Sequence, residues 1–451
     1  MARIKPFRGV RYNSEQFDDM SVVVSQPYDR VRYGLQDRYY ALSDYNIVRV
    51  IRNKEQPGDE KANNVYTRAR DTYDRWLRDG VLAREKQPAL YVFHQTFATP
   101  GGETSTSSVG ATRTHKAFIC ALELTTFDEG VVLPHERTHA GPKVDRLNLL
   151  RATEVNFGLI FMVYPDPGNK VNALLDAAVA GRQPDVDVVE LFEKDVRQQM
   201  WAVTDPKVIA AVRAEMAPKR NLIIADGHHR YETAINYRDE MRALHPDAPA
   251  DAAFNYRMVT LVSMDDPGLT ILPTHREIYG YEEMRPDEIL QRAAEYFTVT
   301  PIASKDACLA AMAEHQAEHA IGFYAGGPYY MLVLKDEALL DQLIPEDRTL
   351  VWKSLDVSIL HRILLEQVVG IPREMIDAKD KVRYHRDPQL PIDAVDAGEA
   401  NFVFFLNPTL MMQVKTCTEM GEKMPAKSTD FYPKAISGLV MCPVGAGERL
   451  G

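Results

Sequence analysis

The stretch "IIADGHHRYETA", residues 223–234, decides the fold prediction because it joins a strand pattern to a helix pattern. Residues 221–225, "NLIIA", are apolar after Asn221 and include two β-branched side chains, which favours a buried strand. Gly227 allows a tight turn, and a helix with an apolar side is predicted to begin near His229 or Arg230. A strand, a glycine turn and a helix in this order aim free backbone N–H groups at an anion.

The charged residues of this turn have two interpretations. Arg230 carries a planar set of donors that suits phosphate or carboxylate. Asp226, at the carboxyl end of the strand, could hold Mg²⁺ or cap the helix. The alternative is that Asp226 only caps the helix and that the two histidines are satisfied locally. Two adjacent histidines followed by an arginine favour the functional interpretation.

A second stretch, "LPHERTHAGPKVDRLNLLRAT" at 133–153, contains "HERTH", which matches the H-E-x-x-H zinc pattern. That pattern binds zinc only inside a helix, where His135 and His139 would share one face. Gly141 and Pro142 would stop such a helix within about two turns. We therefore predict an extended or turn segment followed by a helix from about residue 143, which leaves Glu136 in a loop, free to act as a base or a metal ligand.

A third stretch, "GEKMPAKSTDFYPK" at 421–434, gathers three lysines in an otherwise acidic chain. It is predicted to be a loop that binds a carboxylate or phosphate, and an ordinary solvated loop is the alternative. Lys427, Ser428 and Thr429 are its candidate ligand-binding residues. The segments 25–30, "SQPYDR", and 272–277, "LPTHRE", are weaker candidates of the same kind.

Composition limits the class of protein. The chain has 451 residues, a net charge of −11 and 45% hydrophobic residues, as expected of a globular protein with two or three domains. The acidic balance argues against a nucleic-acid partner. The chain shows no apolar run of membrane-spanning length and no signal peptide, so no membrane partner is expected. Four separated cysteines, with no CxxC pair, favour a reducing cytoplasm.

Helix and strand patterns are mixed along the chain, which predicts an α+β or mixed α/β fold. The texture changes near residues 280–300, where we place a domain boundary. The predicted division is an N-terminal region, 1–290, and a C-terminal α/β domain, 291–451. Neither the pattern nor the composition fixes the oligomeric state, although a homodimer is possible.

Six segments together resemble the DUF1015 family, whose function is unknown. They occur in the family's order and cover nearly the whole chain: "QPYD", "PHERTHAGPKVDRLNLLRAT", "ADGHHRYETA", "ILPTHR", "LDVSILH" and "GEKMPAKSTDFYPK".

A more distant resemblance links "PHE" and "DGHHR" to the ParB/sulfiredoxin-like fold and its free serine kinase branch. This resemblance implies a ParB/sulfiredoxin-like core at about 115–240 with a large insertion at about 155–220. It also implies that Glu136 is the base for phosphoryl transfer to free L-serine, with Mg²⁺ and a nucleotide donor, ADP or ATP. The phosphate turn would consist of Asp226, Gly227, His228, His229 and Arg230.

The expected function is therefore a nucleotide- and Mg²⁺-dependent kinase of a small hydroxylated metabolite, with free L-serine as its substrate. Glu136, Asp226 and His228 are the expected catalytic residues, and Asp226 and Glu136 are the expected metal ligands. The loop lysines could hold a substrate carboxylate. Two alternatives stay open: a nucleotide-binding regulatory protein without turnover, and a metal-dependent hydrolase that uses His135, Glu136 and His139.

Overall fold

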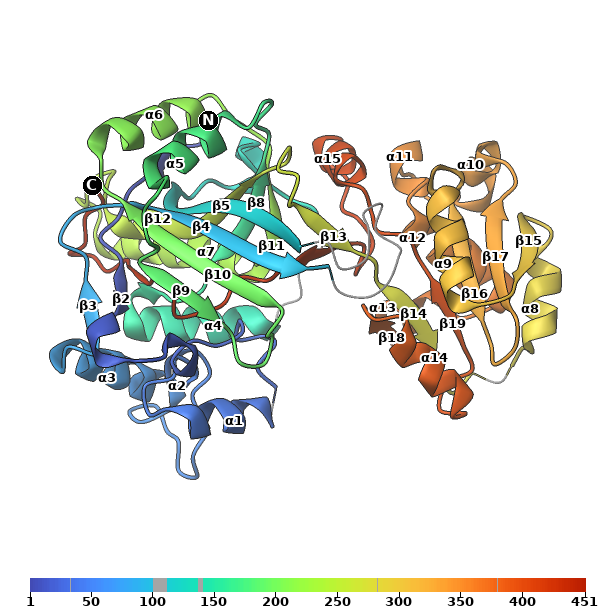
Figure 1. Ribbon diagram of the computed structural model, residues 1–451, viewed down its shortest axis with the longest axis horizontal. Helices are drawn as coiled ribbons and strands as arrows, with labels where there is room; N and C mark the ends of the chain where they lie inside the picture. The colour runs from blue at the N-terminus through green and yellow to red at the C-terminus, as the bar shows by residue number, and fades with distance from the viewer. Residues whose placement is uncertain (33, 100–111, 137–140, 282, 379) are drawn as a thin grey trace.

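The structure, a computed structural model, describes residues 1–451 except 33, 100–111, 137–140, 282 and 379. The chain forms a mixed α/β structure with two lobes, each built around its own main sheet (Figure 1). The mixed α/β class predicted from the sequence is thus confirmed. None of the described helices is long and apolar enough to cross a membrane.

Nine strands form the sheet of the first lobe. Eight of them follow the order β6 (Val132–Pro134), β11 (Leu222–Asp226), β8 (Ile160–Tyr164), β12 (Tyr256–Ser263), β5 (Thr112–Glu123), β4 (Leu90–Ala98), β10 (Val196–Val203) and β9 (Val186–Val189). The ninth, β1 (Ile4–Lys5), pairs with β5 outside this order. Two neighbouring pairs, β6–β11 and β8–β12, are parallel, and the other neighbours are antiparallel.

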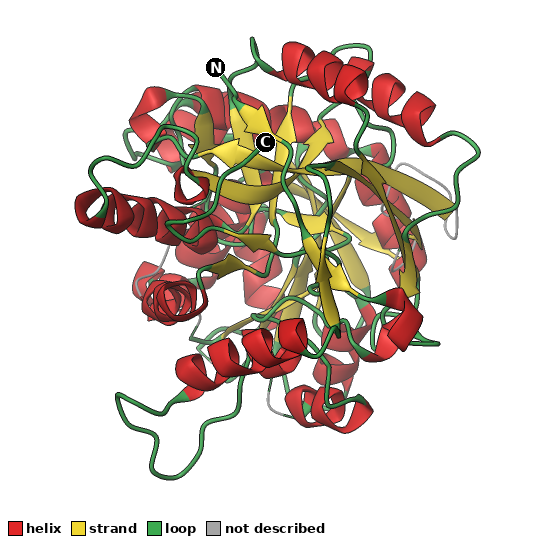
Figure 2. Cartoon of the chain, turned by 90° about the vertical axis from the view of Figure 1, so that its left-hand side faces the viewer, coloured by secondary structure: helices red, strands yellow, loops and turns green. Residues whose placement is uncertain are grey.

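Helices lie on the outside of these strands, as Figure 2 shows. Those of the first lobe are α1 (Leu35–Leu42), α2 (Val48–Ile51), α3 (Val65–Arg78), α4 (Gly141–Thr153), α5 (Lys170–Val179), α6 (Pro206–Met216) and α7 (His228–Leu244). Local sequence explains several helix ends. A capping box of Asn64 and Thr67 starts α3, and Asp205 caps α6, whose first residue is a proline.

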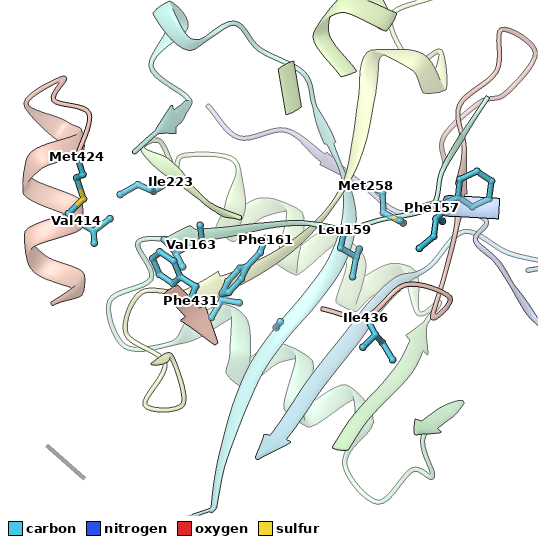
Figure 3. Packing of buried hydrophobic residues seen from close by; sticks show 14 of the residues in the cluster. Phe157, Leu159, Phe161, Val163, Ile223, Met258, Val414, Met424, Phe431 and Ile436 are labelled. Atoms are coloured by element: carbon cyan, nitrogen blue, oxygen red, sulfur yellow. The ribbon is translucent and has the colours of Figure 1, made fainter. Parts of the chain in front are cut away.

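The strand β8 divides the interior into two clusters because successive side chains of a strand point to opposite faces. Phe161 and Val163 belong to the larger cluster and lie beside Phe431 (Figure 3). Ile160 and Met162 belong to the second cluster, to which α5, α6 and α7 also contribute. The segment 155–220, expected to be an insertion, thus supplies a strand in the middle of the sheet, between β11 and β12.

The second lobe contains an antiparallel sheet of six strands, in the order β15 (Phe297–Ile302), β17 (Tyr329–Leu334), β16 (Ala320–Tyr324), β19 (Phe402–Phe405), β14 (His275–Ile278) and β18 (Val382–His385). Its helices are α8 (Pro286–Ala293), α9 (Lys305–Glu314), α10 (Leu340–Leu343), α11 (Leu350–Lys353), α12 (Asp356–Ile359), a π-helix at Leu360–Val369, α13 (Arg373–Ala378), α14 (Gln389–Asp396) and α15 (Met411–Glu419).

The chain passes between the lobes twice, and the two passages pair with each other. β13 (Thr270–Leu272) leads out of the first lobe, and β20 (Asp430–Tyr432) runs antiparallel to it on the way back. After this return, β21 (Cys442–Pro443) pairs with β7 (Val155–Asn156) in the first lobe. A short ribbon of β2 (Val10–Tyr12) and β3 (Leu82–Arg84) lies in the first lobe as well. The division at residue 290 stays a prediction.

Candidate functional site

The turn between β11 and α7 adopts the geometry that its glycine permits. Gly227 has a φ angle of 100°, a left-handed conformation that side chains disfavour. Gly227 is the N-cap residue of α7, and it has no side chain with which to cap the helix. Because the first N–H groups of a helix have no partner inside the helix, the start of this 17-residue helix is suited to binding an anion.

Asp226 lies between two cations at this turn. One carboxylate oxygen accepts a hydrogen bond from the Arg230 guanidinium, and the other lies 3.3 Å from the Lys434 ammonium. Burial opposes ionisation of Asp226, but Lys434 and Arg230 outweigh it and hold the pKa of this carboxyl below its ordinary value. Arg230 is itself buried and also donates to the carbonyl oxygen of Leu159. Both terminal nitrogens of the Arg230 guanidinium, Nη1 and Nη2, are therefore held in place by the protein.

We expect Gly227→Ala to destabilise the protein by about 2–3 kcal/mol, because it combines backbone strain with a clash. An added Cβ would lie 3.0 Å from Nε of Arg230 and would press on the guanidinium that pairs with Asp226. Gly181→Ala is the matched control, since Gly181 has a φ angle of 74° and open space around it. Urea unfolding of both variants measures the difference. Equal losses of unfolding free energy in the two variants would mean that the added Cβ does not disturb Arg230.

Two histidines from different elements meet beside the turn. His135 follows β6, and its ring centroid lies 4.9 Å from that of His228, the first residue of α7. His135 Nδ1 donates to the carbonyl oxygen of Ile224 at 2.6 Å, so its Nε2 accepts from the Thr429 hydroxyl at 2.8 Å. Burial lowers the pKa of His135, which keeps this neutral arrangement.

His228 has a polar atom without a partner beside the turn. Its side chain is buried, and its Nε2 has no hydrogen-bond partner among the described residues. Burial first, and then the neighbouring His135, lower the pKa of His228 well below the ordinary value for histidine. The start of α7 therefore carries a neutral imidazole with a buried, unsatisfied nitrogen, which is uncommon in proteins.

The loop at residues 421–434 reaches the turn from a distant part of the sequence. We call the place where this loop, residues 135–136 and the turn 226–230 meet the junction. Glu136 is half-buried, and its Oε1 accepts a hydrogen bond from the backbone N–H of Lys427 at 2.9 Å. The loop is also held from the second lobe, because Arg276 donates to the carbonyl oxygen of Lys427 at 3.0 Å. Ser428 is buried and donates to the carbonyl oxygen of Pro425, so its hydroxyl serves the loop itself.

Most of the residues predicted from the sequence are thus brought to one edge of the first sheet. The turn residues 226–230 lie at the end of β11, and His229 is half-buried within the first turn of α7. Glu136 and Thr429 reach the same place through His135 and the loop backbone. The Ser428 hydroxyl and the exposed Lys427 side chain are not shown to meet the turn.

Lys434 is a residue of this site that was not predicted from the sequence. It is the last lysine of the quoted loop, and it contacts Asp226 and lies 3.6 Å from Asp430. Arg276 was noted only as part of a weaker segment, although it is fully buried and fastens the loop. The concentration of lysines in this loop of an otherwise acidic chain was a usable signal for Lys434.

The zinc interpretation of "HERTH" receives no support from the described part of this segment. His135 and Glu136 follow β6 in a non-helical conformation, and both ring nitrogens of His135 are already hydrogen-bonded. His139 lies outside the described residues. Among the residues that are described, no group of three or more histidine, cysteine or acidic side chains could hold a metal ion. The helix α4 begins at Gly141, two residues before the predicted start.

The fit of Mg²⁺ to the two predicted ligands differs between them. Both oxygens of Asp226 already contact cationic side chains, so this carboxylate does not fit as a metal ligand. In the hydrogen bonds described, Glu136 accepts only from a backbone N–H, through its Oε1. Its second carboxylate oxygen is therefore the candidate metal ligand. Mg²⁺ is commonly bound by one or two carboxylates together with substrate phosphates, and Glu136 could be such a carboxylate.

Comparison with known proteins gives one family and several distant structures. The model of the family "Protein of unknown function (DUF1015)" matches residues 4–358. No curated protein matches the chain. Three similar solved structures are a conserved hypothetical protein from Pyrococcus furiosus, a free serine kinase in complex with AMP, and SbnI with a C-terminal truncation from Staphylococcus aureus.

These three structures are similar to the chain at low identity. The Pyrococcus furiosus protein is 13% identical with a TM-score of 0.30, and the match covers 66% of this chain and 86% of that one. The free serine kinase is 13% identical with a TM-score of 0.30, over 66% and 83%. The Staphylococcus aureus protein is 11% identical with a TM-score of 0.32, over 71% and 87%.

Proposed function

The chain belongs to the DUF1015 family, whose function is unknown, and we propose that it is a nucleotide- and Mg²⁺-dependent kinase of a small hydroxylated metabolite, free L-serine. The observation that carries this proposal is the junction at the start of α7. There, uncapped N–H groups, Lys434 and the unpartnered Nε2 of His228 lie near a half-buried glutamate, Glu136.

Phosphoryl transfer depends on positioning and on neutralising charge, and the junction can do both. The N–H groups of the first turn would hold phosphate oxygens, with Gly227 permitting close approach. Lys434 would add positive charge. Arg230 and Asp226 hold each other and Lys434 in place, so we assign them a positioning role. A Mg²⁺ ion bound with the nucleotide would offset the charge of the phosphates.

Glu136 is the proposed base. A serine hydroxyl is a weak nucleophile at neutral pH, and a carboxylate that accepts its proton speeds attack on the phosphoryl group. The Lys427 N–H orients one oxygen of Glu136 and leaves the carboxylate at the edge of the junction. The neutral His228 imidazole would contact the nucleotide or the acceptor through its Nε2.

The proposal includes the organisation of the chain. The elements that form the junction, β6, β11 and the first turns of α7, lie within the ParB/sulfiredoxin-like core proposed for about residues 115–240. The division into residues 1–290 and 291–451 belongs to the same proposal, as do a cytoplasmic location and the absence of nucleic-acid and membrane partners.

We expect ADP or ATP with Mg²⁺ to raise the melting temperature of the full chain, because a ligand that binds the native state stabilises it. A thermal-shift series with ADP, ATP and CTP measures this, and phosphoserine formation from L-serine with each donor measures transfer. Binding without phosphoserine would support a regulatory nucleotide-binding protein instead. The absence of any shift with all three nucleotides would contradict both functions.

A further inference from the structure

A small cavity lies beside the turn and has Arg230 in its lining. It has a volume of about 60 Å³ and is lined by polar and apolar side chains. Its buried polar residues are Asn156, Arg230, Thr233, Arg257 and Ser437. A larger cavity of about 300 Å³ borders it and shares three lining residues, Ile51, Arg146 and Leu149.

Arg257 is the feature of this cavity that the fold alone does not explain. It lies on β12, is 6% exposed, and donates from Nη2 to the carbonyl oxygen of Gly158 at 2.6 Å. Its Nε has no hydrogen-bond partner, and no described carboxylate forms an ion pair with it. Burial first, and then the like charge of Arg230, lower the pKa of Arg257 to about 9. The group is therefore still charged at neutral pH.

A buried charge without a counter-charge is costly, so a fold that keeps one has a reason for it. Arg230 is equally buried, but it pairs with Asp226. Arg276 also lacks an acidic partner, yet its guanidinium donates to the carbonyl oxygens of Thr274 and Lys427. Arg257 differs from both, because it has a buried N–H without a partner and belongs to the lining of a cavity.

Thr233 provides a second unsatisfied group in the same wall. It lies on α7, three residues after Arg230, and is 3% exposed. Its hydroxyl has no hydrogen-bond partner among the described residues. Two lining residues of one small cavity, from different elements, thus each carry an unpartnered polar atom. Buried polar atoms in proteins are normally satisfied by a protein group, a water or a ligand.

We propose that this cavity binds the carboxylate of a small organic acid, with Arg257 as its ion-pair partner and Thr233 as a further hydrogen-bond donor. A compact monoanion suits a cavity of this size, whose other walls include Phe157 and Leu150. The inference deepens the proposed function by assigning the acid group of the substrate. It rests on that function only for the identification of the bound acid as the phosphoryl acceptor.

The connection to the turn runs through one side chain. Arg230 lines the cavity and at the same time pairs with Asp226, the residue that ends β11. An acid held by Arg257 would therefore lie next to the junction at which the proposed transfer occurs. This position differs from the one expected from the sequence, where the lysines of the 421–434 loop were the candidates for a carboxylate.

The test is acid binding by the full chain in the absence of nucleotide. Melting temperatures are measured with L-serine, D-glycerate and sodium acetate at matched ionic strength. Ethanolamine, which is serine without its carboxylate, is the ligand control, and sodium phosphate is the second arm. We expect the carboxylates to raise the melting temperature and ethanolamine to leave it unchanged.

Variants locate the binding in the cavity. Arg257→Gln should weaken acid binding by about 10- to 150-fold, the loss for a charge-assisted hydrogen bond. Thr233→Val should weaken it by about 3- to 10-fold without lowering stability, because the hydroxyl that it removes has no partner. Arg242→Gln is the matched control, since Arg242 lies on the same helix and donates to Asn255 outside the cavity lining.

Three outcomes would overturn the assignment. They are no shift with any of the three acids, equal acid binding by the parent, Arg257→Gln and Thr233→Val, and a shift with phosphate alone. Thr233→Val carries the test if Arg257→Gln does not fold. Nucleotide binding by Arg257→Gln is measured separately and should match the parent. Acid binding without phosphorylated product would keep the cavity assignment and reject the kinase.

Discussion

Glu136→Gln is expected to lower the rate of phosphoryl transfer to L-serine by about 10²–10⁴-fold, the contribution of a positioned general base. The variant retains the shape of the side chain and removes its basicity. Its amide oxygen can still accept the hydrogen bond from the Lys427 N–H, so the loop should keep its position. Nucleotide affinity and melting temperature should therefore stay close to those of the parent. Phosphoserine formation with each donor is the measurement.

Glu419→Gln is the control for this experiment. Glu419 is an exposed glutamate at the end of α15 that, like Glu136, accepts a hydrogen bond with its Oε1, in this case from Asn221 at 3.1 Å. It lies at the opposite end of β11 from Asp226, and transfer by this variant should equal that of the parent. If Glu136→Gln transfers as fast as an active parent, Glu136 is not the base.

Arg230→Met is expected to destabilise the protein by about 3 kcal/mol, the lower end of the range for breaking a buried ion pair. The substitution retains the apolar stem but leaves Asp226 with Lys434 as its remaining partner. It also removes the donor to the Leu159 carbonyl oxygen. The lower end applies because the Asp226 side chain is 25% exposed. Urea unfolding gives the change in free energy.

Arg151→Met is the matched control, because Arg151 likewise pairs with an acid, Glu240 of α7, but both side chains are more exposed. It should cost less than about 1 kcal/mol, as is usual for a surface ion pair. Equal costs for the two variants would contradict the importance given to the Asp226 pair.

The same pair predicts a pH dependence. The folded-state pKa of Asp226 is below its ordinary value of 3.8, so the unfolded chain binds more protons between these two values. The stability from this pair is complete above about pH 4 and is lost as the pH falls through the folded-state pKa. The difference in stability between the parent and Arg230→Met should therefore shrink below pH 4.

The turn between β11 and α7 could be predicted from local sequence alone. The apolar run before Asp226 and the glycine after it predicted a strand and a turn, and both are present. The glycine and proline at 141–142 also predicted that His135 and Glu136 precede a helix, and α4 begins at Gly141. These features depend on neighbouring residues, so a single sequence contains the necessary information.

Long-range contacts could not be predicted in the same way. Lys434 meets Asp226 across 208 residues, and Thr429 meets His135 across 294, with no local pattern that pairs them. Arg257 lies within "YRMVTLVS", where one charged residue in an apolar strand gives no sign of a missing partner. The position of β8 between β11 and β12 could not be predicted either, because an apolar run indicates a buried strand but not its neighbours in the sheet.

The two passages between the lobes have a consequence for synthesis. The loop that touches Glu136 and His135 is translated after the whole six-stranded sheet of the second lobe. A ribosome that has completed the first lobe's sheet has therefore not yet made Lys427, Thr429 or Lys434. The junction can form only after the intervening lobe has emerged, so a polypeptide released before residue 427 would contain the glycine turn and lack the ability to assemble the site around it.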